Sequence, residues 1–73
     1  MNELDIALRD ALGLPPHITV FVRYRHVTES LAEATAALTK QNLHYPGPYN
    51  FRSAIIPRDG KFIALATWDN LGD

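Results

Sequence analysis

The chain has no cysteine among its 73 residues, which excludes a disulfide framework and a thiolate metal site. Its first residues, from Met1 to Asp5, lack the basic start and apolar stretch of a secretory signal. No apolar run approaches the ~20 residues that a membrane-spanning helix needs. We therefore expect a cytoplasmic protein with no membrane partner.

A large charge of one sign is also lacking, since the formal net charge is −1. This balance argues against a protein that coats nucleic acid by charge alone, although it leaves room for a local basic patch. The composition, 47% hydrophobic and 21% charged, is typical of a folded domain. At this length we expect one domain with a thin core.

Motifs for catalysis or cofactor binding are missing. The chain contains no GxSxG, no GxGxxG and no phosphate-binding loop. Its three histidines, His17, His26 and His44, have no second ligand at a metal-binding spacing. His26 is the one candidate acid–base residue, because imidazole titrates near neutral pH. We predict a protein that is not an enzyme and that binds no metal, cofactor or small-molecule substrate.

The strongest local signal is Asp59-Gly60 between two apolar runs, which predicts a hairpin with a type I′ turn. A two-residue turn fixes the register, with Arg58 opposite Lys61 and Ala54 opposite Leu65. Alternation then places Ala54, Ile56, Ile63 and Leu65 on one face. The other face carries Phe51, Ile55, Phe62, Ala64 and Trp68. Both faces are apolar, so each needs a cover.

The remaining pattern predicts a helix at about 2–12, a strand at about 17–27 and a helix at about 28–41. The strand alternates, with Ile18, Val20, Val22 and Tyr24 on its core face. A Pro/Gly loop follows at 44–49, then the hairpin at about 51–68 and a frayed tail at 69–73. Pro57 lacks a ladder donor, which suits an edge or a strand end.

These elements predict a single α+β domain of order α-β-α-β-β. We expect a three-stranded sheet with both helices packed on one face. The strand order stays open, because either hairpin strand can lie beside the first strand.

The sheet face opposite the helices is the predicted binding surface. It would combine aromatic side chains with arginines, the residues Phe21, Arg23, Arg25, Phe62 and Trp68. Such residues are enriched in protein interfaces, and they also stack and neutralise single-stranded nucleic acid. We expect an adaptor- or inhibitor-type module that binds a protein partner or itself; the alternative is a single-stranded RNA- or DNA-binding module.

Two structural interpretations compete with binding at these positions. Phe62 and Trp68 can form a small packed cluster while the arginines are merely solvated. Likewise, Tyr45 and Tyr49 in the Pro/Gly loop either pack on the sheet or protrude as a secondary contact loop.

Overall fold

The computed structural model describes residues 1–45 and 49–69, and it confirms the α+β class and the predicted element order. Along this part of the chain, no helix is long and apolar enough to cross a membrane. Of the predicted loop and tail, residues 46–48 and 70–73 lie outside the described part. The elements are α1 (Glu3–Ala11), β1 (Tyr24–Thr28), α2 (Leu31–His44), β2 (Arg52–Arg58) and β3 (Lys61–Thr67).

The hairpin register is confirmed. Arg58 pairs with Lys61, and Ala54 pairs with Leu65. Asp59 and Gly60 have φ angles of 53° and 76°, the positive values that a type I′ turn requires at both central positions. This local turn chemistry therefore fixes which residues face each side of the sheet.

The sheet has the order β1-β3-β2, and both pairings are antiparallel. The open question of strand order is thus resolved, with β3 in the centre. Hydrogen-bonded pairs alternate along an antiparallel ladder, and a two-residue turn is closed by such a pair. The backbone N–H groups of Arg58 and Ile56 therefore point toward β3. Pro57 lies between them, so the position at which it lacks an N–H points away from β3. Its position on the outer edge confirms the edge-strand prediction.

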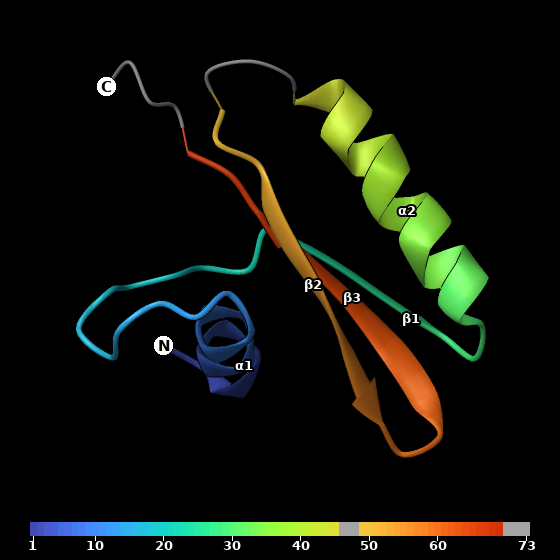
Figure 1. Cartoon of the computed structure of the whole chain (residues 1–73), viewed down its shortest axis with the longest axis horizontal. Helices are drawn as coiled ribbons and strands as arrows, with labels where there is room; N and C mark the ends of the chain where they lie inside the picture. Colours follow the sequence, from blue (N-terminus) through green and yellow to red (C-terminus); the bar gives the residue numbers. More distant parts are fainter. Residues whose placement is uncertain (46–48, 70–73) are drawn as a thin grey trace.

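The two helices lie on opposite faces of the sheet, so the prediction that both cover one face was wrong (Figure 1). Leu8 of α1 packs with Ile63 and Leu65 of β3. Ala34 and Leu38 of α2 pack instead with the small residues of β3, Ala64 and Ala66. The physical reason is that both faces of the hairpin are apolar, and a single helical layer leaves one of them in water.

The first strand is also shorter than the predicted 17–27, because its pairing with β3 begins at Tyr24 and the alternation changes just before that residue. The Arg23 N–H donates to the Ala66 carbonyl at 2.9 Å, although Ala66 is already the partner of Tyr24. Two residues opposite one is the arrangement of a β-bulge, which shifts the side chains that follow to the other face. Val22 accordingly packs on the α1 side and Tyr24 on the α2 side.

Helix α1 begins at a capping box. The Asn2 side chain accepts from the Asp5 N–H at 2.9 Å, and the Asp5 carboxylate accepts from the Asn2 N–H at 3.0 Å. The other carboxylate oxygen of Asp5 accepts the Val22 N–H at 2.8 Å. One buried carboxylate thus caps the helix and also ties the chain that enters β1.

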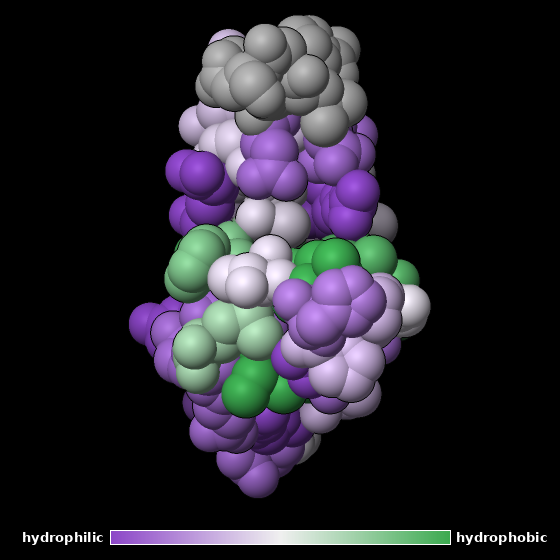
Figure 2. Space-filling view, turned by 90° about the vertical axis from the view of Figure 1, so that its left-hand side faces the viewer, coloured by the Kyte–Doolittle hydropathy of each residue, from purple (hydrophilic) through white to green (hydrophobic). Residues whose placement is uncertain are grey.

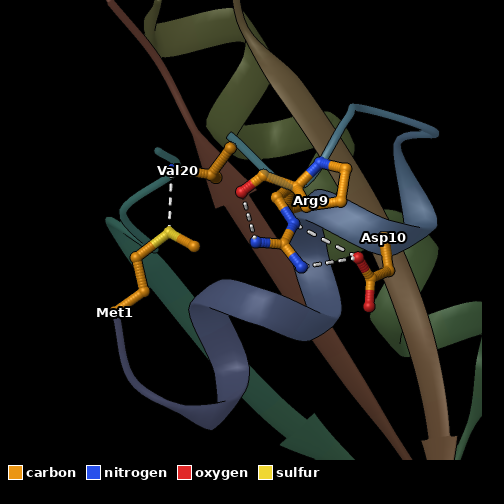
Figure 3. Close-up of polar contacts among 5 residues, drawn as sticks. Met1, Arg9, Asp10 and Val20 are labelled. Atoms are coloured by element: carbon orange, nitrogen blue, oxygen red, sulfur yellow. Dashed lines mark hydrogen bonds and ion pairs between the residues drawn. The ribbon is translucent and has the colours of Figure 1, made fainter. Parts of the chain in front are cut away.

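Two further polar contacts hold the connection between α1 and β1 (Figure 3). The Arg9 guanidinium donates to the Pro16 carbonyl at 3.1 Å and also pairs with Asp10 at 3.1 Å. The Met1 sulfur accepts the Val20 N–H at 3.2 Å. These contacts place Val20 in the core beside Leu8, so the connection forms part of the α1 layer.

We predict that Asp5→Ala lowers the free energy of unfolding by about 1–3 kcal/mol. The substitution removes the helix cap and leaves the Val22 N–H without a hydrogen-bond acceptor. The Val22 hydrogen bond, with a smaller contribution from Asn2, outweighs burial and holds the Asp5 pKa below its ordinary 3.8. A lowered folded-state pKa contributes stability above the unfolded value and loses it as pH falls through the folded value. Urea denaturation of both proteins between pH 7 and acid should therefore show a smaller acid loss in the variant. An equal loss would contradict this role.

A second prediction tests the opposite-face packing. Ala64→Leu should cost about 1–3 kcal/mol, because Ala64 is fully buried against α2 and a larger side chain overfills that contact. The matched control is Ala36→Leu on the exposed side of α2, which should stay within about 0.5 kcal/mol of the parent. Thermal unfolding measures both, and equal stability of the two variants would contradict the placement of α2.

Candidate functional site

The predicted binding face is not an open sheet face, because α2 covers it. Phe62 and Trp68 are half-buried and pack beside Ala64 and Ala66 under this helix. Arg25 pairs with Leu65, which places it on the α1 side of the sheet. The five predicted residues therefore do not share one surface.

The structure instead brings several of them together at one end of the sheet. Tyr45, which directly follows α2, stacks on Trp68 with ring centroids 4.1 Å apart and planes 17° apart. Phe51 is nearly parallel to Trp68 at 6.1 Å, and Tyr49 meets Tyr45 edge-on at 5.7 Å. We call these four residues, Tyr45, Tyr49, Phe51 and Trp68, the aromatic cluster.

The two ends of the hairpin hold this cluster in place. The Asp69 N–H donates to the Tyr49 carbonyl at 2.6 Å, which continues the pairing of the strands beyond β2 and β3. Arg23 lies over the Trp68 ring, with its guanidinium carbon 5.9 Å from the centroid, within cation–π range. The loop tyrosines and the sheet aromatics are therefore one unit, and Tyr45 packs on the sheet rather than protruding.

A cleft of about 230 Å³ adjoins the cluster through Arg23, which lines the cleft and lies over the Trp68 ring. Phe21, which is 62% exposed, forms part of its wall. We call it the arginine cleft, and its lining consists of Leu12, Leu14, Ile18, Thr19, Val20, Phe21, Arg23, Arg52, Thr67 and Asp69. Figure 2 views the side of the sheet that carries α1, where hydrophobic side chains gather in the middle between strongly hydrophilic ones.

Of the predicted residues, Tyr45, Tyr49 and Trp68 lie in the aromatic cluster, and Phe21 and Arg23 line the arginine cleft. The sequence pattern did not indicate Arg52 or the cleft. Arg52 begins β2 and pairs with Thr67, so its place follows from the hairpin register. The missing signal is tertiary, because the segment before β1 forms the opposite wall and its path depends on the bulge at Arg23. No sequence period encodes that contact.

The described residues contain no candidate metal site. Within 1–45 and 49–69, no group of three or more His, Asp or Glu side chains could hold a metal ion. His26, the one candidate acid–base residue, is exposed on β1. The absence of catalytic activity stays a prediction.

Comparison with family models, with curated proteins and with solved structures finds no match to this chain. The aromatic cluster and the arginine cleft are therefore the features from which we infer a function.

We predict that Tyr45→Ala exposes the indole of Trp68 to water. Trp68 is the only tryptophan, so its emission reports this contact without ambiguity. The emission should shift to longer wavelength, and the loss of the stacked pair should cost about 1–2 kcal/mol in urea denaturation. The control is Leu43→Ala in the last turn of α2, because Leu43 is 77% exposed and its loss should leave the emission unchanged. Unchanged emission in Tyr45→Ala would contradict the stack.

Proposed function

We propose that this protein is a small, non-catalytic interaction module that binds a partner protein where the aromatic cluster meets the arginine cleft. The observation that carries the proposal is Phe21, a large aromatic that is 62% exposed beside two arginines. Aromatic and arginine side chains dominate the energetics of protein interfaces when they enter a pocket or meet one. The packed aromatic cluster provides a second apolar contact surface next to Phe21 and the cleft.

The single-stranded nucleic-acid alternative has less support. Binding of bases needs free aromatic faces, yet Tyr45 stacks on the Trp68 ring and Arg23 lies over it. Phe62, the other sheet aromatic in that hypothesis, is half-buried against α2. Binding of single-stranded nucleic acid is therefore one of the outcomes that the test below distinguishes.

The test starts with affinity capture from native cells, followed by titration of the purified partner. Phe21→Ala should weaken that partner by about tenfold or more, as expected for an interface anchor. Val27→Ala is the matched control, because Val27 is 48% exposed on β1 and does not line the cleft. Light scattering across a dilution series identifies the partner as a second copy if a dimer is lost in Phe21→Ala.

Two results would overturn the proposal. The first is equal affinity of Phe21→Ala and the parent for every captured protein. The second is tight binding of a single-stranded oligonucleotide that weakens steeply with salt, with a slope that Arg23→Ala flattens. Such a slope would identify phosphate contacts and establish the nucleic-acid alternative.

A further inference from the structure

The arginine cleft contains two guanidinium groups, those of Arg23 and Arg52. Among the described residues, the ion pairs involve Arg9 and Arg58, and neither Arg23 nor Arg52 lies within 4.0 Å of a carboxylate oxygen. Neutral groups hold both arginines instead. Arg23 lies over the Trp68 ring, and the Asn50 amide oxygen, oriented to satisfy both side chains, accepts from Arg52 at 2.9 and 3.2 Å. Their charge remains available to an anion.

A threonine hydroxyl belongs to the lining of the same cleft. Thr67 is 8% exposed, and its hydroxyl takes part in none of the side-chain hydrogen bonds found along residues 1–45 and 49–69. The hydroxyls of Thr28, Thr35 and Thr39 each donate one. No buried side-chain oxygen or nitrogen of the described residues lacks a hydrogen-bond partner, so the Thr67 hydroxyl is not a buried orphan. It lines the cleft as one more donor that a ligand atom can use.

Apart from Thr19 and Asp69, the rest of the cleft lining is apolar. Leucine, isoleucine, valine and phenylalanine side chains form its walls, the residues Leu12, Leu14, Ile18, Val20 and Phe21. Two cations and a hydroxyl therefore lie beside a short hydrophobic surface. This combination is complementary to a carboxylate attached directly to a carbon that bears an apolar side chain.

We propose that the arginine cleft binds the C-terminal residue of a partner protein, with the α-carboxylate at Arg23 and Arg52 and an apolar side chain against Phe21. The Thr67 hydroxyl donates to the same carboxylate. The inference rests on the proposed function and names the part of the partner that this surface recognises. Capture of a chain terminus by its carboxylate is an established mode of peptide recognition.

The size of the cleft favours a protein terminus over a free small molecule. A cleft of about 230 Å³ is smaller than the ~300–1,000 Å³ typical of small-molecule sites and has room for little more than one residue. The preceding residues of the partner would then contact the aromatic cluster, since Arg23 joins the two surfaces.

Asp69 also lines the cleft and gives the proposal a distinctive signature. Its carboxylate shares the cleft with the two guanidinium groups, so it repels an incoming carboxylate. Removing that charge should tighten binding, an effect that a merely structural role for Asp69 does not produce.

The test is an amide-resolved NMR titration of the whole chain with the probe peptide N-acetyl-Gly-Ser-Gly-Leu as the free acid. We expect saturable shifts at Phe21, Arg52 and Thr67, and binding weaker by about tenfold or more for the same peptide with a C-terminal amide. Arg52→Gln should weaken the free acid to a similar extent, and Asp69→Asn should tighten it. Arg25→Gln, an exposed arginine outside the cleft, is the matched control and should bind like the parent.

Three outcomes would overturn the inference. Equal affinity for the free-acid and amide peptides would show that the cleft does not recognise the carboxylate. The absence of saturable shifts would show that the peptide does not bind at the cleft. Binding of N-acetyl-leucine as tight as that of the peptide assigns the cleft to a small carboxylic acid. The spectra also show whether each variant is folded. Loss of affinity for captured partners in Phe21→Ala, with no preference for a free C-terminus, would leave the interaction function standing and reject the carboxylate alone.

Discussion

The structure depends on one constraint, the burial of the central strand on both of its faces. In β3, every residue from Ile63 to Thr67 is buried, so neither face can be left to water. The large residues, Ile63 and Leu65, meet the leucines of α1, whereas the small alanines between them meet the alanine-rich α2. The size of alternate β3 side chains thus decides how closely each helix approaches, and a 73-residue chain becomes three layers.

The candidate site is a consequence of this layering. Because α2 crosses the face on which Trp68 lies, its C-terminal end brings Tyr45 onto the indole ring. The segment before β1 belongs to the other layer and reaches the same end of the sheet through the bulge at Arg23. Arg23 therefore touches Trp68 of the α2 layer and also lines a cleft walled by the α1 layer. The candidate site lies where the α1 and α2 layers meet at one end of the sheet. It therefore does not require a pocket inside the small hydrophobic core.

Most of the fold could be predicted from local sequence signals, whereas the candidate site depends on long-range packing. Asp59-Gly60 was enough to predict the register and the two residue sets on the sheet faces, because a two-residue turn permits one pairing. The same sets showed two apolar faces, and the error was to cover only one of them. The bulge at Arg23 contains no glycine or proline, so the sequence gives no sign of it. The alternating pattern therefore places Tyr24 on the same face as Val22, which is wrong. The neighbours of Trp68, and the cleft that Arg52 and Phe21 share, follow from the placement of the helices and loops. A short sequence period does not predict that placement.

Pro57 has a consequence for how these molecules can assemble. It lies on the outer edge of β2 and offers no N–H there, so an added strand finds an incomplete ladder. The opposite edge, β1, contains no proline and keeps its full set of donors. An added strand therefore pairs more readily along β1 than beside Pro57, so the two edges of this sheet are not equivalent as sites for strand addition.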